Sequence, residues 1–332
     1  MKPTTSMKAA VLENYFDPFR YATVARPVPS VGQVLVNISA SGVNPQDLSI
    51  RIGEVLFESY ALPAILGIDL AGIVAATGPG VTDFLRGDEV FGLAGGAACF
   101  QGTLAEYAVV DARLIAHKPT NLSMREAAAI PLTFCSAWEG LVGRARLKHG
   151  NTVLVQNGAS DLAHLAIQIS LALGAKVYAT GAGSTCERIE ELGAVSINSD
   201  KLTVEHYVAK FSGGRGFDVV FDTAGGATLD DAFRAVKYFG HVISTCGWGT
   251  HSLIALATKS ANFSAVSPIL LLTCEEGRQS QGHILYEATR LIESGKLLPK
   301  IDPHRFGLQA VNEAYELLAS GRACGKLVVD VR

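Results

Sequence analysis

In the first third of the chain, short apolar and β-branched runs alternate with polar residues and are broken by glycine and proline. A typical turn between them is Gly78-Pro79-Gly80. This spacing predicts an irregular antiparallel β domain. Its expected strands include residues 33–38, 72–76, 89–91 and 107–110.

The pattern changes near residue 123, where Ser123 and Glu126 form a capping box that begins a helix. From there, short apolar strands alternate with helical patterns at roughly 20 to 25 residues per unit, the length of one βα unit. Apolar residues between Leu162 and Leu173 recur every three or four positions and mark one helix face. The alternation predicts a Rossmann-type, doubly wound parallel sheet. Its expected strands are Thr152–Gln156, Lys176–Thr180, Val195–Asn198, Asp218–Asp222 and His241–Cys246.

The last segment reads as a helix over about residues 308–320 and a strand over 325–331. We expect this strand to return to the first domain. The predicted fold is therefore α/β with two domains, which suits a chain of 332 residues. Residues 1–125 and 296–332 form the β domain from both chain ends, and residues 126–295 form the Rossmann nucleotide-binding domain.

The composition of the chain argues against nucleic-acid binding and against membrane association. The chain is 48% hydrophobic and 18% charged with a formal net charge of −3, and it has no basic tract. Neither nucleic-acid binding nor a polybasic membrane patch is expected. The apolar stretch Pro268–Leu272 is too short to span a bilayer, and residues 1–7 lack the apolar region of a secretory signal. We expect a soluble, cytoplasmic protein.

The six cysteines include no Cys-x-x-Cys pair, and no histidine lies at zinc-finger spacing from a cysteine pair. The sequence therefore predicts no metal site. We expect the cysteines to be reduced and mostly buried, as small hydrophobic side chains.

The strand ending at Gln156 runs directly into a turn and a helix, the geometry that binds a dinucleotide pyrophosphate. Against Gly-x-Gly-x-x-Gly, Gly158 holds the first place, Ser160 the second and Ala163 the third. The Ser160 hydroxyl could donate to a phosphate oxygen, whereas the Asp161 carboxylate would repel it. Two interpretations stay open here: a dinucleotide loop, and an ordinary βαβ turn capped by Asp161.

The second strand indicates which nucleotide is preferred. NAD sites usually place an acidic residue about 20 residues after the first glycine, to bind the ribose 2′-hydroxyl. Residues 178–185 contain none. We therefore expect NADPH rather than NADH, with Ser184, Thr185 and Arg188 as candidate ligands of the 2′-phosphate.

Ordered motifs extend this interpretation to nearly the whole chain. They are Ser41–Asp47, Arg51–Gly53, Leu62–Gly72, Gly87–Gly92, Gly102–Tyr107, Ala127–Leu132, Leu192–Ala194, Phe221–Gly226 and Gly325–Lys326. Together they resemble the medium-chain dehydrogenase/reductase superfamily, in its zinc-independent quinone oxidoreductase branch, which includes zeta-crystallin-like proteins. The resemblance implies a GroES-like β domain formed by both chain ends, a Rossmann domain, a cleft between them and a homodimer.

The resemblance also implies NADPH-dependent reduction of a quinone or an α,β-unsaturated carbonyl compound. Zinc-using relatives carry a cysteine where Asn44 stands and Gly-His-Glu where Gly67-Ile68-Asp69 stands, together with a four-cysteine lobe. None of these features is present in this sequence, so the resemblance implies zinc independence.

Site residues follow from the same resemblance. Ser136 lies near the nicotinamide, Asn44 lines the substrate cleft, and Lys326 belongs to the terminal Gly-Lys motif. The chain departs from the family pattern at Thr185, where a lysine is frequent, and at Ser49, where a tyrosine is frequent. The implied cofactor-binding residues are Ser136, Gly158, Ala159, Ser160, Asp161, Leu162, Thr180, Ser184, Thr185, Arg188, Cys246, Gly247 and Lys326.

Hydride delivery to an enone or quinone places negative charge on the carbonyl oxygen, which then needs hydrogen-bond donors. Asn44 and Ser136 are the candidates for orientation and oxyanion contact, and Tyr60 is a candidate proton donor. Alternatively, Asn44 is a turn residue before Pro45, and Tyr60 is a packed rim aromatic. Asp69 is expected to hold a backbone turn, as is Asp47.

A second function class stays open. Ser160, Asp161 and Thr185 are each unfavourable for nucleotide binding. They are compatible with a catalytically idle relative that keeps the fold and acts as a binding or structural protein.

Overall fold

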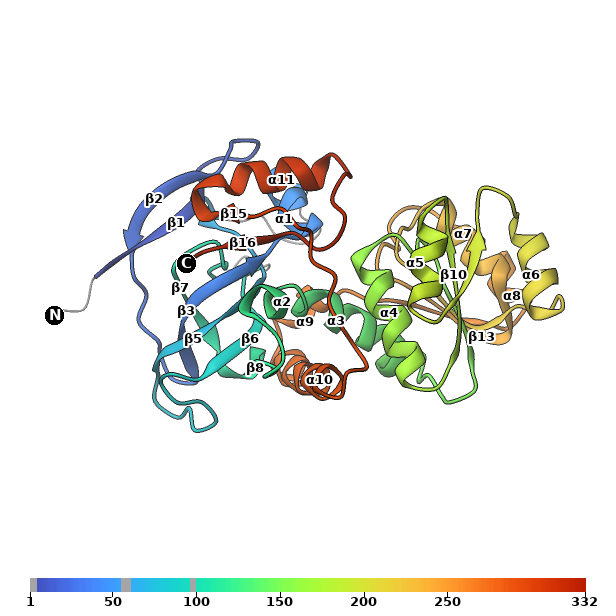
Figure 1. The fold of residues 1–332 in the computed structure, drawn as a ribbon, viewed down its shortest axis with the longest axis horizontal. Coiled ribbons are helices and arrows are strands. Elements are labelled where there is room, and N and C mark those ends of the chain that lie inside the picture. Colours follow the sequence, from blue (N-terminus) through green and yellow to red (C-terminus); the bar gives the residue numbers. More distant parts are fainter. Residues whose placement is uncertain (1–4, 55–60, 96–99) are drawn as a thin grey trace. The chain divides into compact units, whose positions relative to one another are not determined.

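The computed structural model describes residues 5–54, 61–95 and 100–332, which divide into two compact units (Figure 1). The first unit comprises Met1–Leu132, Ile269–Glu293 and Pro299–Arg332. The second comprises Thr133–Pro268 and Ser294–Leu298. Within the described ranges, no helix is long and apolar enough to cross a membrane.

Two mainly antiparallel sheets form the first unit. The smaller has the order β2-β1-β4, and the larger has the order β15-β16-β3-β5-β6-β8 with β7 paired to β3. Only the β15–β16 pair is parallel among the strands described in these sheets. The strands are β1 (Ser6–Leu12), β2 (Arg20–Ala25), β3 (Gln33–Gly42), β4 (Ala64–Ile65), β5 (Asp69–Thr77), β6 (Glu89–Leu93), β7 (Tyr107–Asp111), β8 (Ile115–His117), β15 (Phe306–Gly307) and β16 (Val328–Asp330).

The last strand joins the first sheet, as the sequence predicts. β16 pairs with β3 in antiparallel register, with Val328 opposite Gly42. Helix α11 (Val311–Ala319) contacts β15 and β16 (Figure 1). Its Tyr315 lies in the core of the unit. Both chain ends therefore build one β domain, which confirms the expected fold class.

Helices of different lengths connect these strands. The predicted capping box is present at α2, where Ser123 Oγ accepts from Glu126 N and Ser123 N donates to Glu126 Oε2 at 2.8 Å. The helices of this unit are α1 (Pro45–Arg51), α2 (Met124–Ala128) and α10 (Glu275–Glu293), with 3₁₀ turns η1 (Ala112–Leu114) and η3 (Leu308–Ala310); α9 (Pro268–Leu271) begins at the unit boundary.

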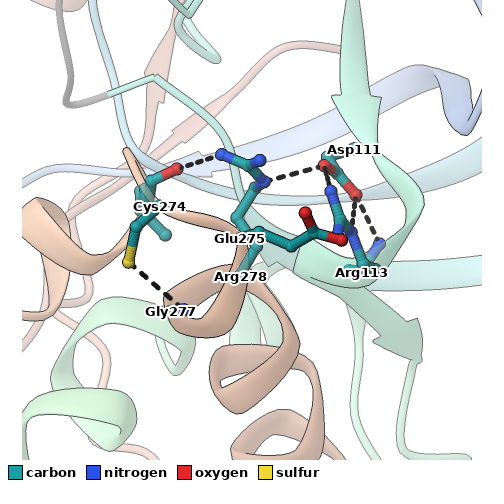
Figure 2. Close-up of polar contacts among 7 residues, drawn as sticks. Asp111, Arg113, Cys274, Glu275, Gly277 and Arg278 are labelled. Atoms are coloured by element: carbon teal, nitrogen blue, oxygen red, sulfur yellow. Dashed lines mark hydrogen bonds and ion pairs between the residues drawn. The ribbon is translucent and has the colours of Figure 1, made fainter.

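Helix α10 belongs to the first unit, whereas the sequence analysis assigned its residues to the Rossmann domain of 126–295. Its N-terminal end is tied to η1 and β7 by ion pairs from Arg113 Nη1 to Glu275 Oε1 at 3.2 Å and from Arg278 Nε to Asp111 Oδ2 at 3.0 Å (Figure 2). A Cβ at Gly282 would lie 2.4 Å from the Arg113 carbonyl oxygen, so glycine permits the close approach of the helix.

The second unit contains a parallel six-stranded sheet with the order β11-β10-β9-β12-β13-β14. The chain runs outward from β9 to β11 on one side and from β12 to β14 on the other. The strand order therefore reverses between β9 and β12, the position where open α/β sheets bind ligands. The strands are β9 (Thr152–Val155), β10 (Lys176–Gly181), β11 (Val195–Asn198), β12 (Phe217–Asp222), β13 (Val236–Ser244) and β14 (Asn262–Ala265).

Five of these strands match the expected ones, and β14 is an addition. Residues 262–265 include only two apolar side chains and lie at the edge of the sheet, so their pattern lacks the apolar run of a buried strand. The helices of this unit are α3 (Pro131–Trp138), whose first two residues are grouped with the first unit, α4 (Asp161–Ala172), α5 (Thr185–Glu191), α6 (Val204–Ser212), α7 (Ala227–Ala235) and α8 (Ile254–Ala257), with a π-helical segment η2 (Glu139–Arg144).

The cysteines are less buried than expected. Cys135 is buried in α3, but Cys274 and Cys324 are exposed at a helix start and in a loop. Cys99 lies outside the described residues.

Candidate functional site

The loop after β9 turns tightly against β10. Asn157 has φ +55°, and the N–H of Gly158 donates to the Thr180 carbonyl at 2.7 Å. A Cβ at position 158 would lie 2.7 Å from Ile189 Cδ1 and 2.9 Å from that carbonyl. Packing against the neighbouring strand and α5 therefore already requires glycine here, whether or not a nucleotide binds.

Ser160 is the N-cap of α4, and its Oγ accepts from Ala163 N at 3.1 Å. The same Oγ lies 3.1 Å from Thr223 Oγ1, which itself donates to the Gln156 carbonyl at 3.0 Å. Because the Thr223 hydrogen is used in that bond, Ser160 must be the donor in the contact between the two hydroxyls. The Ser160 hydroxyl thus bridges two strand ends and has no hydrogen left for a phosphate.

Two backbone donors remain at this turn. In the described structure the N–H groups of Ala159 and Leu162 donate to no protein acceptor. Asp161 is the first residue of α4 and adds a negative charge to the first turn. The turn therefore fits a pyrophosphate through its backbone, with one carboxylate acting against it.

The end of β10 carries no carboxylate from Thr180 through Thr185. Thr180 Oγ1 accepts from Asn157 N at 3.1 Å, so this side chain supports the β9 turn. Ser184 immediately precedes α5, and Arg188 Nη2 lies 3.4 Å from Thr185 Oγ1. One helix turn thus places two hydroxyls and a guanidinium beside this strand end, a donor set suited to a phosphate.

The ends of β12 and β13 are joined through the buried Asp222 carboxylate. Asp222 Oδ1 accepts from the N–H groups of Ala224 and Gly225, both at 3.1 Å, and Oδ2 accepts from Ser244 Oγ at 2.6 Å. Ser244 Oγ accepts in turn from Cys246 N at 3.1 Å. We call Ser160, Thr223, Asp222, Ser244 and Cys246 the strand-end frame, because they connect the ends of three adjacent strands.

Asp222 and Ser244 are not among the site residues expected from the sequence. The available signal was a polar residue, Asp222, directly after the apolar run Val219–Phe221. Burial raises the pKa of the Cys246 thiol, with the nearby Asp222 charge adding to that effect. Cys246 therefore contributes packing and a backbone donor rather than a thiolate.

A second polar centre lies in the first unit, and it is almost completely buried. Asn44 Nδ2 donates to Asp69 Oδ2 at 2.9 Å, and Lys326 Nζ donates to Asn44 Oδ1. The same ammonium pairs with Asp69 Oδ2 at 3.2 Å, and Asp69 Oδ1 accepts from Leu132 N at 2.7 Å. This arrangement fixes the Asn44 amide and leaves one Nδ2 hydrogen without a partner among the residues that the structure describes.

Asp47 completes this centre. Its Oδ2 accepts from Tyr315 Oη at 2.8 Å and from Asn44 N at 3.2 Å, and its Oδ1 accepts from Gly67 N at 3.2 Å. Burial raises the pKa of Asp47 to about 6, despite these donors. Asp47 thus holds the backbone at Asn44 and Gly67, whereas Asp69 accepts from the distant Leu132 N–H and pairs with the side chains of Asn44 and Lys326. We call Asn44, Asp47, Asp69, Lys326 and Tyr315 the Asn44 network.

The predicted site residues fall into two groups. Asn44 and Lys326 meet in the first unit, and the other described ones lie in the second unit. Ser136 is buried in α3, and Gly247 follows the strand-end frame. Tyr60 lies outside the described residues. Among the residues that the structure describes, no group of three or more histidine, cysteine, aspartate or glutamate side chains is placed to hold a metal ion.

Comparisons with known proteins agree with this architecture. Residues 30–120 match the alcohol dehydrogenase GroES-like domain, and residues 192–329 match a family described as zinc-binding dehydrogenase. The chain is 34% identical over 317 residues to a 2-methylene-furan-3-one reductase of Solanum lycopersicum, covering 93% of this chain and 74% of that protein. It is 32% identical over 334 residues to a chloroplastic NADPH-dependent alkenal/one oxidoreductase of Arabidopsis thaliana, covering 97% and 79%.

A solved structure is also similar. The crystal structure of an alcohol dehydrogenase superfamily protein from Novosphingobium aromaticivorans has a TM-score of 0.96 and 48% sequence identity, covering 98% of this chain and 100% of that chain.

Proposed function

Because the chain belongs to the medium-chain dehydrogenase/reductase superfamily, we propose that it is a zinc-independent reductase that uses NADPH to reduce an α,β-unsaturated carbonyl compound or a quinone. The observation that carries the proposal is the pair of N–H groups, of Ala159 and Leu162, that have no acceptor within the described part of the chain and lie at the switch point of the parallel sheet. The two relatives, named for an enone substrate and for NADPH-dependent alkenal/one reduction, support the substrate class and the cofactor.

NADPH, when bound, supplies the hydride. The backbone of Gly158–Leu162 would hold its pyrophosphate, and Ser184, Thr185 and Arg188 would hold its 2′-phosphate. The absence of a carboxylate from Thr180 to Thr185 supports NADPH over NADH, because no charge there repels a 2′-phosphate.

Zinc independence is supported by the cation already present in the Asn44 network. Lys326 contacts Asn44 and Asp69, the positions that match zinc-ligand and Gly-His-Glu positions in zinc-using relatives. An ammonium beside these oxygens would repel a second cation. The amide and carboxylate are moreover occupied by hydrogen bonds to each other.

In the proposed reaction, Asn44 is the candidate donor to the substrate oxygen. Lys326 donates to the Asn44 carbonyl and so polarises the amide, which strengthens the remaining Nδ2–H as a donor. That hydrogen would stabilise the negative charge that hydride transfer places on the carbonyl oxygen. Ser136 remains the second candidate, and water can return the proton to the enolate.

The alternative is a relative that has lost nucleotide binding. The commitment of the Ser160 hydroxyl to Thr223 and the Asp161 charge on α4 favour it. The homodimer and the cytoplasmic location inferred from the sequence remain proposals of the same kind.

A titration separates the two functions. NADPH is added while the fluorescence of Trp138 and Trp248 is followed, with NADH as the matched control, and the consumption of NADPH is then followed with an enone and with a quinone. We expect saturable NADPH binding, weaker NADH binding and turnover of at least one acceptor class. Absence of saturation below millimolar NADPH would establish the idle relative instead.

A further inference from the structure

The loop of residues 245–253, between β13 and α8, is anchored at its start by the strand-end frame. Cys246 N donates to Ser244 Oγ at 3.1 Å, and a Cβ at Gly225 would lie 2.2 Å from the Cys246 carbonyl oxygen. We call these residues the β13–α8 loop. Cys246 and Gly247 lie at its start, at the carboxyl end of the sheet. The loop has a second anchor nearer its end.

His251 forms this second anchor. Its Nδ1 lies 2.8 Å from Asp230 Oδ1 on α7, and its Nε2 lies 3.2 Å from the Trp248 carbonyl oxygen (2.7–3.2 Å is the usual hydrogen-bond range). The ring packs edge-to-face on Phe233 at a centroid distance of 6.2 Å. Only 12% of the His251 side chain is exposed. One imidazole thus connects the loop to a helix and to its own backbone.

The number of N–H donors that the two contacts require indicates the charge of the His251 ring. A carboxylate oxygen and a carbonyl oxygen can only accept, and a neutral imidazole carries one N–H. Both contacts are therefore satisfied only by the imidazolium, which carries two. His241 is a contrasting case, because its Nε2 lies 2.9 Å from Ser264 Oγ, a hydroxyl that can donate. A neutral ring suffices there.

We propose that His251 is a positioning residue for nucleotide binding, and that its imidazolium holds the β13–α8 loop closed between Asp230 and the Trp248 carbonyl. This role rests on the proposed function, because it matters through the cofactor contacts that the family resemblance implies for Cys246 and Gly247. His251 lies outside the sequence motifs that predict the cofactor site.

The surrounding charges favour the imidazolium. The hydrogen bond to Asp230 raises the pKa of His251 above its ordinary value, with further contributions from the Trp248 carbonyl and the Asp222 charge. On α7, the nearby Arg234 is paired with Asp231, and with Glu205 on α6. We call the two hydrogen bonds of the His251 imidazolium, to Asp230 and to the Trp248 carbonyl, the clamp. Because the pKa of His251 is raised in the folded protein, the clamp is fully present below pH about 6.5. It is lost as the pH rises through the pKa of the folded protein.

Trp248 reports on the clamp without any nucleotide, since its own carbonyl accepts from His251. In a Trp138→Phe background, the fluorescence of Trp248 is measured against pH for the parent, His251→Gln, Asp230→Asn and His206→Gln. His206 is an exposed histidine of α6 and serves as the matched control. We expect one transition above pH about 6.5 in the parent and in His206→Gln, its loss in His251→Gln, and its shift to lower pH in Asp230→Asn.

The same proteins are then titrated with NADPH below and above that transition. We expect the Kd of the parent to rise about three- to tenfold across it, the ratio that corresponds to the net contribution of one ordinary hydrogen bond, and the Kd of His251→Gln to change much less. The 2′-phosphate of NADPH itself titrates near pH 6, and this contribution is common to all variants. Asp230→Asn retains the histidine and tests the clamp if His251→Gln does not fold.

Three results overturn the inference. If the Trp248 fluorescence does not change with pH, or changes equally in His251→Gln, then His251 does not form the clamp. A transition without a change in Kd removes the positioning role and leaves the reductase proposal intact. Absence of NADPH binding at every pH overturns the reductase proposal and the positioning role together, whatever the fluorescence shows.

Discussion

The Asn44 network of the first unit and the strand-end frame of the second unit both join distant segments through buried carboxylates, but they differ in what they leave unpaired. Asp69 and Asp47 each accept from several enclosed donors, and one hydrogen of Asn44 remains. In the second unit, Asp222 also accepts from several donors, while the N–H groups of Ala159 and Leu162, in the turn after β9, have no acceptor among the described residues.

The difference indicates a division of roles. Substitutions in the Asn44 network should mainly affect the stability of the first unit, because each removes a partner from a buried charge. Substitutions around the strand-end frame should affect nucleotide affinity as much as stability, because the frame lies at the carboxyl ends of β9, β12 and β13, where open α/β sheets bind ligands. The following experiments test that division.

The largest effect is expected from Lys326→Met, which leaves Asp69 as a buried carboxylate without its cation. We expect the first unit to lose about 3–5 kcal/mol, the usual cost of breaking a buried ion pair. Both tryptophans lie in the second unit. The measurement is therefore hydrogen exchange of β3 and β16. The control Lys8→Met removes an exposed lysine of the same unit, and equal protection in both variants would contradict the prediction.

A pH dependence is expected next, from Asp47. Its pKa is about 6 in the folded protein and near 3.8 in its ordinary state, so the folded protein binds this proton more tightly. Stability of the first unit should therefore fall as the pH rises from about 4 to 6, by up to about 3 kcal/mol, and level off above. Hydrogen exchange across this range measures it. Asp47→Asn should flatten this slope, and an unchanged slope would assign it to another group.

Ser244→Ala tests the strand-end frame. The substitution removes the donor to Asp222 and the acceptor of Cys246 N, while Asp222 keeps its two backbone donors. We expect a loss of about 1–2 kcal/mol in urea unfolding followed by tryptophan fluorescence, together with weaker NADPH binding. Ser196→Ala, on the edge strand β11, is the control. A stability loss with unchanged NADPH affinity would show that the frame does not position the nucleotide.

The smallest effect is expected from Asp161→Asn. Removal of the charge should strengthen NADPH binding a few-fold, since the carboxylate would repel the pyrophosphate, and should weaken α4 by about 0.3–1 kcal/mol. Calorimetric titration at low and high salt measures the affinity, and the gain should shrink with salt. A gain that does not depend on salt would mean that the charge is not its cause.

Much of the fold was predictable because its signals are local. The apolar strands of the parallel sheet and the helix face from Leu162 to Leu173 follow from periodicity, and the capping box at Ser123 follows from four residues. The assignment of α10 was not predictable in this way. Its amphipathic pattern specifies a buried face, but only its contacts with η1 and β8 specify what covers that face.

The sequence by itself determined the order of strands and helices, the carboxylate-free end of β10 and the lack of closely spaced metal-ligand pairs, because each is a property of neighbouring residues. Only the tertiary structure decided which polar groups form hydrogen bonds with one another. Lys326 reaches Asn44 across 282 positions, and the Ser160 hydrogen is committed to a hydroxyl 63 positions away. Hydrogen bonds are made between neighbours in space, and the spatial neighbours of a polar group are set by the packing of the apolar elements that carry it.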